Sequence, residues 1–268
     1  MEIIRVPGLN GLGNTEGCEK AGNEVVKELR KIYSNEKGKA IDTDALHFEE
    51  IHVNNSNLPE ASELIYKNSY ERHLINDKLA FLGGDHSISY SLVKGFWEYC
   101  KEDGKEPCLI VFDAHPDCMS SADSEIPTHE EWLKALVDSG FPAENVLVVG
   151  LRNSYPEESE FMKEKGIQSV DLNKFMEDLT ETSDVLMEFT RGREVYVSID
   201  VDVVDPAFTP GTGYKEPGGF TSREFLYVFH RINKIKNLKT IDIVEINPDK
   251  DRDNLTSRFS AKILSEFI

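Results

Sequence analysis

Short apolar runs rich in β-branched residues alternate along this chain with longer stretches of helical periodicity. This alternation is typical of βα units packed around a parallel sheet. Six apolar runs are predicted to be buried strands: Glu2–Val6, Lys78–Leu82, Cys108–Phe112, Asn145–Val149, Glu194–Ile199 and Lys239–Val244. The pattern therefore predicts an α/β fold, and the length of the chain predicts one domain that spans residues 1–268.

Helices are predicted between these strands. From Ser87 to Cys100 the apolar side chains recur at helical spacing, which predicts a helix that packs on the sheet. The glycine-rich run Gly8–Gly17 lacks the spacing of a dinucleotide-binding fingerprint, so an ordinary loop is expected there. Two capping boxes predict further helix starts: Thr128 with Glu131, and Thr221 with Glu224.

The charge balance argues against nucleic acid and anionic membranes as partners. Among 268 residues, 49 are acidic and 30 basic, and the net charge of −19 would repel phosphate groups. No apolar run approaches the roughly 20 residues needed to cross a bilayer. The four cysteines form no Cys-x-x-Cys pair and no secretory leader is recognisable, so reduced thiols and a cytoplasmic location are expected.

Asp, His or Glu residues lie at the ends of four predicted strands. The segments are Gly83-Gly84-Asp85-His86-Ser87, Asp113-Ala114-His115-Pro116-Asp117, Ser198-Ile199-Asp200-Val201-Asp202 and Asp242-Ile243-Val244-Glu245. In a parallel sheet the carboxyl ends of all strands share one edge, where ligands bind. Each segment alone has an ordinary explanation as a loop or a turn. Together, their charges would repel one another unless a cation neutralised them, which predicts a metal site.

The residue types indicate which metal fits. Carboxylates with two imidazoles, and without paired cysteine thiolates, suit a hard or borderline divalent ion such as Mn²⁺ better than structural zinc. In an extended backbone, the spacing Asp113-x-His115-x-Asp117 directs alternate side chains to one side, as does Asp200-x-Asp202. Side chains at this spacing can bind two adjacent metal ions that share ligands.

Three of these motifs resemble the signatures of the ureohydrolase family, which includes arginases, agmatinases and formiminoglutamases. The matching segments, Gly-Gly-Asp-His-Ser, Asp-Ala-His-x-Asp and Ser-Ile-Asp-Val-Asp-x-x-Asp-Pro-x-x-x-Pro-Gly-Thr-Gly, lie between residues 83 and 219. The resemblance implies an arginase-like three-layer αβα sandwich with a mainly parallel central sheet. It also implies two Mn²⁺ per chain, a homo-oligomer (trimer or hexamer), and hydrolysis of a carbon–nitrogen bond in a small guanidino or related amidine substrate.

The resemblance further implies a set of metal ligands. One manganese ion would be bound by His86, Asp113, Asp117 and Asp200, and the other by Asp113, His115, Asp200 and Asp202. The two carboxylates common to both sets would bridge the ions. Two such ions lower the pKa of a shared water enough to make a nucleophile available near neutral pH.

The expected catalytic residues are Asp117, His129 and Glu245. By resemblance, Glu245 would orient the guanidinium of the substrate; the alternative is a strand-end carboxylate paired with a lysine. His129 lies in the loop where the family carries a proton-shuttling histidine; the alternative is a surface histidine. If Thr128 caps a helix, the helix dipole would keep the His129 imidazole neutral. Two other acidic residues, Asp85 and Asp205, are expected to support the site or form turns.

The sequence departs from arginases where arginases recognise the amino acid head of the substrate. Cys118-Met119-Ser120 lacks the asparagine that arginases carry there, and Tyr214 stands where the family has a smaller residue. Agmatine or a guanidino acid is therefore expected to be a better substrate than arginine. Arg152 is either the partner of a distant substrate carboxylate or a surface or capping arginine. Formiminoglutamate hydrolysis, a single-zinc deacylase and a non-catalytic metal-binding protein are the alternatives.

Overall fold

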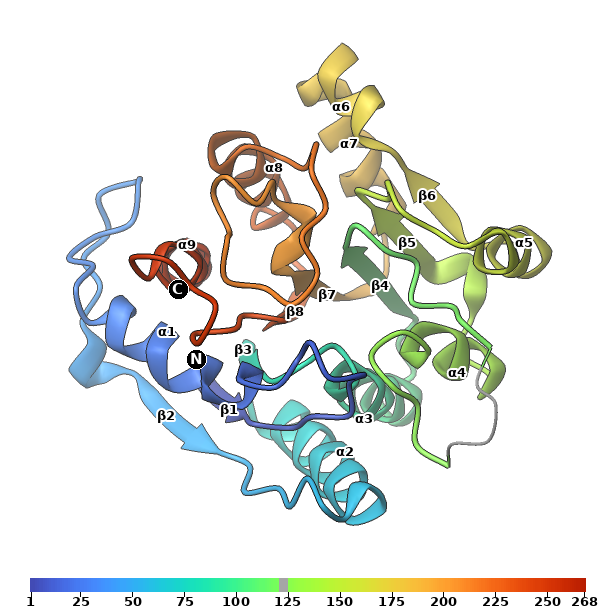
Figure 1. Ribbon diagram of the computed structural model, residues 1–268, viewed down its shortest axis with the longest axis horizontal. Helices are drawn as coiled ribbons and strands as arrows, with labels where there is room; N and C mark the ends of the chain where they lie inside the picture. The colour runs from blue at the N-terminus through green and yellow to red at the C-terminus, as the bar shows by residue number, and fades with distance from the viewer. Residues whose placement is uncertain (121–124) are drawn as a thin grey trace.

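The computed structural model describes residues 1–120 and 125–268. Its centre is an eight-stranded sheet whose strands all pair in parallel. The strands are β1 (Glu2–Val6), β2 (His47–Glu50), β3 (Leu79–Gly83), β4 (Pro107–Phe112), β5 (Val146–Val149), β6 (Gln168–Val170), β7 (Glu194–Asp200) and β8 (Leu238–Val244). From one edge to the other they are ordered β2-β1-β3-β8-β7-β4-β5-β6 (Figure 1).

Helices cover both faces of this sheet. They are α1 (Ala21–Leu29), α2 (Leu58–Ile75), α3 (Ile88–Glu102), α4 (Trp132–Asp138), α5 (Pro156–Lys165), α6 (Leu172–Glu177), α7 (Leu179–Phe189), α8 (Ser222–Ile232) and α9 (Leu255–Phe267). Short 3₁₀ turns span Cys18–Lys20, Thr43–Ala45, Ala143–Asn145 and Val201–Val203. Side chains of α1 and α6 to α9 pack on one face, and those of α2 to α5 pack on the other (Figure 1). The expected three-layer αβα sandwich is confirmed.

Alternation along the strands divides the apolar core into two halves. On β3, Ala80 and Leu82 belong to the half under α1 and α6 to α9, whereas Leu79 and Phe81 belong to the half under α2 to α5. A strand covered on both faces must be apolar at successive positions, because its side chains point alternately to each layer. This requirement explains why the central strands are recognisable as continuous apolar runs.

All six predicted strands are present, each within one residue of its expected bounds. The sequence patterns did not reveal β2 and β6, which form the two edges of the sheet. Edge strands are covered less completely, and three of four residues in β2 are only half-buried, so an uninterrupted apolar run is not required. Within the described ranges, no helix is long and apolar enough to cross a membrane.

One of the two predicted capping boxes is confirmed. Thr221 caps α8, and the side chain of Glu224 accepts a hydrogen bond from the Thr221 backbone. The other prediction is wrong: Glu131 accepts from the Thr128 N–H at 3.0 Å, but α4 begins only at Trp132 and the Thr128 hydroxyl has no hydrogen-bond partner among the described residues. His129 therefore lies in a loop and not in the first turn of a helix.

Candidate metal centre and active site

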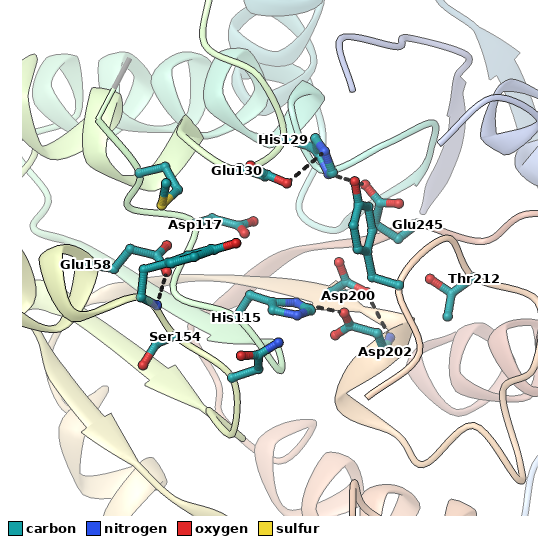
Figure 2. A pocket seen from close by; sticks show the side chains of 14 residues that line it. His115, Asp117, His129, Glu130, Ser154, Glu158, Asp200, Asp202, Thr212 and Glu245 are labelled. Atoms are coloured by element: carbon teal, nitrogen blue, oxygen red, sulfur yellow. Dashed lines mark hydrogen bonds and ion pairs between the residues drawn. The ribbon is translucent and has the colours of Figure 1, made fainter. Parts of the chain in front are cut away.

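The four strands that carry the candidate ligands are consecutive in the middle of the sheet, in the order β3-β8-β7-β4. Because these strands are parallel, the segments that follow them leave the sheet at the same edge. Figure 2 shows side chains from the segments at the ends of β4, β7 and β8 gathered around one pocket, with His115, Asp200 and Asp202 close to one another. His86, from the segment after β3, contacts Asp113, Asp117 and Asp200. The expected convergence of four separate segments is found in the structure.

One cluster of ligand atoms surrounds His86, which lies between β3 and α3. Its Nδ1 atom lies 3.0 Å from Asp113 Oδ2, 3.0 Å from Asp117 Oδ2 and 3.4 Å from Asp200 Oδ2. His86 Nδ1 and Asp113 Oδ2 are buried, and neither has a hydrogen-bond partner among the described residues. Buried polar atoms normally find partners, so oxygen and nitrogen atoms that converge without hydrogen bonds fit a divalent cation.

A second cluster overlaps the first. Ligand atoms of Asp113, His115 and Asp202 all lie within 4.8 Å of one another. His115 Nδ1 is 3.0 Å from Asp202 Oδ2 and 3.5 Å from Asp113 Oδ1. Asp113 thus belongs to both clusters, as a bridging carboxylate would. Asp200 contacts His86 in the first cluster, and its bridging role stays a prediction.

A buried hydrogen-bond network fixes the orientation and protonation of His86. The Ser198 hydroxyl donates to Asp242 Oδ1 at 2.7 Å, so its oxygen accepts from His86 Nε2 at 3.0 Å. Tyr196 and Ser89 also donate to Asp242, each at 2.9 Å, and hold its carboxylate in place. With its proton on Nε2, His86 directs the lone pair of Nδ1 at the carboxylates. This is the tautomer that binds a metal through Nδ1.

Asp117 and Asp200 are buried beside other carboxylates, which disfavours their charged forms. Burial and the charge of Asp113 raise the pKa of Asp117 to about 7. Burial and the charges of Asp202 and Asp113 also raise the pKa of Asp200. Buried like charges are costly unless a cation offsets them, so the cluster favours a bound positive ion.

Asp117 is held by a residue that the sequence patterns did not reveal. The indole nitrogen of Trp132, the first residue of α4, donates to Asp117 Oδ2 at 2.7 Å, and the indole ring lies 4.7 Å from the His86 ring. Asp117 also has a left-handed backbone with φ of 51°, which non-glycine residues rarely adopt. An apolar residue near a helix start normally belongs to the core, so no sequence signal marked Trp132 as a partner of this carboxylate.

Glu245 lies beside the two clusters, directly after β8. Its Oε1 atom accepts from the backbone N–H of His86 at 2.9 Å, and its Oε2 atom lies 3.9 Å from the Cys18 thiol. Like Asp117, it has a left-handed backbone, with φ of 61°. The alternative in which Glu245 pairs with a lysine is wrong for the described residues, because its ion-pair partner there is His129.

His129 is buried, so the alternative of a surface histidine is wrong. Its Nδ1 atom lies 3.4 Å from Glu245 Oε1, and its buried Nε2 atom has no hydrogen-bond partner among the described residues. Burial alone would lower the pKa of His129, but the hydrogen bond and charge of Glu245 outweigh it and raise the pKa to about 9. A neutral imidazole was expected only if Thr128 capped a helix; no helix begins at Thr128, and the neighbouring carboxylate favours the protonated ring.

The glycine-rich loop after β1 is a structural bridge between Asp85 and the His129 loop. Asp85 Oδ2 accepts from the Asn10 N–H at 2.8 Å and from the Thr15 hydroxyl at 3.2 Å. The Asn10 side chain donates to the carbonyl oxygens of Ile126 and Pro127 at 3.1 and 2.9 Å. Asp85 is therefore a supporting residue, as expected, and the loop is an ordinary one.

The side chain of Arg152 is hydrogen-bonded to backbone carbonyl groups. Its guanidinium donates to the carbonyl oxygens of Gly150, Asp202, Val203, Glu216 and Pro217. Five bonds use all five N–H groups of an arginine. The interpretation of Arg152 as the partner of a substrate carboxylate is therefore wrong. Asp205, which accepts from the backbone of Ala207 and Gly218, is a turn residue as expected.

The pocket above the clusters encloses about 520 Å³ of space, including its open mouth. Its lining residues are His115, Asp117, Met119, His129, Glu130, Asn153, Ser154, Tyr155, Glu158, Asp200, Asp202, Thr212, Tyr214 and Glu245. The Tyr214 ring forms one wall, 5.3 Å from the His129 ring and 6.2 Å from the His115 ring. The predicted catalytic residues Asp117, His129 and Glu245 thus share one cavity with candidate metal ligands.

The parallel sheet and the paired clusters define an α/β protein with a group of residues at the carboxyl edge of its strands that could bind metal ions. The chain belongs to the arginase family, whose family model matches residues 1–268. Members of this family are metal-dependent hydrolases that act on carbon–nitrogen bonds in amidines.

Sequence relatives include both arginases and agmatinases. The chain is 34% identical over 187 residues to arginase 1, mitochondrial, from Oryza sativa subsp. indica, a match that covers 69% of this chain and 53% of that protein. It is 35% identical over 190 residues to agmatinase from Bacillus subtilis (strain 168), covering 70% of this chain and 61% of the relative. The matched part thus spans little more than half the length of these curated relatives.

The fold is similar to that of a solved structure, proclavaminate amidino hydrolase from Streptomyces clavuligerus. The TM-score is 0.87 at 24% identity, and the match covers 99% of this chain and 89% of that one. At this level of identity the similarity shows the fold alone.

Proposed function

We propose that this protein is a binuclear manganese hydrolase that cleaves a carbon–nitrogen bond of a guanidino or amidine compound and releases urea. The observation that carries this proposal is the pair of ligand clusters that share Asp113. The proposed ligands of the two ions are those inferred from the motifs: His86, Asp113, Asp117, Asp200, His115 and Asp202. Carboxylate oxygens with imidazole nitrogens, and no thiolate, support Mn²⁺.

Each chemical role is supported by a contact in the pocket. When bound there, two divalent ions supply Lewis acidity and bring the pKa of water toward neutrality. Glu245 presents a buried carboxylate, fixed by the His86 N–H, against which a planar guanidinium can be oriented. A substrate held in this orientation needs less activation free energy, because binding has already brought the reacting groups together.

His129 is proposed to protonate the leaving amine. The carboxylate of Glu245 favours its protonated form, and its Nε2 atom is buried beside the pocket without a hydrogen-bond partner among the described residues. A proton on that nitrogen is available to a group bound in the cavity. After the amine departs, the neighbouring Glu245 carboxylate favours uptake of a new proton by the same ring.

Three further proposals follow from the resemblance to ureohydrolases. Residues 1–268 are proposed to form a single ureohydrolase domain, which the one central sheet supports. The protein is proposed to be cytoplasmic, which agrees with the free thiols of all four cysteines. A homo-oligomer, as a trimer or hexamer, is proposed on the resemblance alone.

The test is turnover of a substrate panel by the Mn²⁺-loaded protein, with urea, formamide, ammonia and acetate measured separately. The panel contains agmatine, 4-guanidinobutyrate, arginine, formiminoglutamate and an acetylated lysine. Urea release, with about two equivalents of manganese per chain by elemental analysis, is the expected result. Formamide as the main product would instead identify a formiminoglutamase.

Other results would contradict the proposal in different ways. Deacetylation with a single zinc ion would support the deacylase alternative. Two bound ions without turnover of any compound would support a non-catalytic metal-binding protein. The Asp113→Asn variant provides the background rate, because it lacks the carboxylate common to both clusters.

A further inference from the structure

The charged residues that line the pocket are all acidic or histidine. Among the described lining residues, none is lysine or arginine, and the nearby Arg152 uses its N–H groups on backbone carbonyls. Protonated His129 already contacts Glu245 and Glu130, so a carboxylate carried by a substrate would enter without a free cationic partner from the described lining residues, which is unfavourable. The described lining therefore favours substrates that carry positive charge and no carboxylate.

Most of the pocket carboxylates are already engaged. Glu158 accepts from the backbone N–H of Cys118 at 3.0 Å and from that of Tyr155 at 2.9 Å. Asp117 accepts from Trp132, and its other contacts lie within the ligand clusters. The carboxylates of Glu158 and Asp117 therefore have little hydrogen-bonding capacity left for a substrate in the outer part of the pocket.

Glu130 differs from them. Among the described residues its carboxylate accepts no hydrogen bond, and its ion-pair contact is with His129 Nε2 at 3.8 Å. Its side chain is 34% exposed, compared with 6% for His129 and 4% for Glu245, so it lies nearer the mouth. Its backbone is fixed, because the carbonyl of Glu130 accepts from the Met119 N–H at 2.9 Å.

Glu130 and Glu245 contact opposite ring nitrogens of the same imidazole. His129 Nδ1 contacts Glu245 and His129 Nε2 contacts Glu130, and Figure 2 shows both contacts. The two carboxylates therefore flank one ring of the pocket lining, that of Glu245 buried and that of Glu130 partly exposed. Because both contacts are made to one imidazole ring, a single small substrate can approach both carboxylates.

We propose that Glu130 binds a second positive charge at the end of the substrate away from the guanidinium. The inference rests on the proposed function and narrows it to guanidino compounds that carry a terminal amine and no carboxylate. An ammonium group beside Glu130 gains a charge-assisted hydrogen bond, whereas a terminal carboxylate is repelled there. Glu130 is thus a specificity-determining residue that stabilises the bound substrate.

The test compares three compounds of similar length with different ends: agmatine with an amine, n-pentylguanidine with a methyl group, and 4-guanidinobutyrate with a carboxylate. In Glu130→Gln, the ratio of kcat/KM for agmatine to that for n-pentylguanidine should fall about tenfold, the effect of one charge-assisted bond at a partly exposed site. The loss should appear mainly in KM for agmatine, because binding at the distal end is common to the ground and transition states.

Two further variants serve as a control and as a reversal of the charge. Glu160→Gln removes the same charge from an exposed position on α5, outside the pocket, and should leave the ratio unchanged. Glu130→Lys should shift the preference toward 4-guanidinobutyrate, which a simple loss of folding or of catalysis would not produce.

Binding provides a readout without turnover. By calorimetry with the manganese-loaded protein, butane-1,4-diamine should bind with a lower Kd than n-butylamine. In Glu130→Gln, the ratio of the Kd of n-butylamine to that of butane-1,4-diamine should fall about tenfold.

The outcomes separate failure of this inference from failure of the proposed function. An unchanged ratio in Glu130→Gln would overturn the inference while urea release by the wild-type protein upholds the function. An equal fall in kcat for agmatine and n-pentylguanidine would also overturn it, because Glu130 would then act through His129. If the wild-type protein hydrolyses no guanidine, the proposed function fails and the inference fails with it.

Discussion

His73 predicts a specific acid sensitivity of the fold. It lies in α2 with 1% of its surface exposed, packed between the Phe96 and Tyr99 rings at centroid distances of 5.3 and 5.7 Å. Its Nδ1 atom donates to the Ser69 carbonyl at 2.6 Å, and its Nε2 atom is 2.7 Å from the Thr240 hydroxyl. Both ring nitrogens are therefore used by the neutral imidazole. Burial lowers the pKa of His73 from 6.5 to about 3.

The direction of the effect follows from proton linkage. Because the pKa in the folded state lies below that in the unfolded state, the unfolded chain binds the proton more readily. The contribution of His73 to stability is fully present above pH 6.5 and is lost as the pH falls from 6.5 toward 3. Each pH unit in this window corresponds to about 1.4 kcal/mol, so roughly 2 kcal/mol is lost by about pH 5.

The assay is urea unfolding of wild type and His73→Gln at about pH 7 and pH 5, which gives the free energy of unfolding at each pH. The variant should be less stable at neutral pH, and should lose about 2 kcal/mol less on acidification. Any loss of metal at low pH affects wild type and His73→Gln equally, so it cancels when their losses of stability are compared. His52→Gln, at a side chain that is 86% exposed, controls for loss of an imidazole. Equal acid losses in wild type and His73→Gln would refute the reasoning.

Three further predictions concern the metal centre. Asp113→Asn should lower binding of both manganese ions, whereas His86→Ala should mainly empty one site; equal and slight losses by elemental analysis would contradict the shared ligand. His129→Ala should lower turnover by ~10² with little loss of metal, and a wild-type rate would remove the proton-transfer role. Trp132→Phe removes the donor to Asp117 Oδ2 and should weaken manganese affinity by about 10- to 100-fold, measured by metal titration. Unchanged affinity would show that this hydrogen bond does not position the ligand.

The central strands could be predicted from sequence because burial on both faces leaves an uninterrupted apolar run. Every residue of β3 and of β4 is buried, and both strands were expected within one residue of their bounds. Strands β2 and β6 could not be predicted in this way, because they form the edges and keep polar, partly exposed residues. Their place in the sheet depends on pairing with a neighbour and not on their own pattern.

The convergence of the candidate ligands was also predictable, for a topological reason. Asp113 and Glu245 directly follow β4 and β8, and Asp200 is the last residue of β7; parallel strands present such positions at one edge whatever their order. Sequence did not determine that these strands are neighbours in the sheet, nor that Ser198 and Asp242 fix the tautomer of His86. Those contacts join strands that are adjacent only after folding.

Sequence by itself determined the central strands, the fold class and the residues that gather at the carboxyl edge, because periodicity and strand ends are local properties of the chain. Tertiary structure alone placed Glu245 beside His129, where its carboxylate raises the pKa of the imidazole, and no helix begins at Thr128. It also decided that Arg152 binds backbone carbonyls and that Glu130 keeps a carboxylate available in the pocket. Charge state and available hydrogen-bonding capacity depend on partners from distant segments, which come together only when the sheet and its loops assemble.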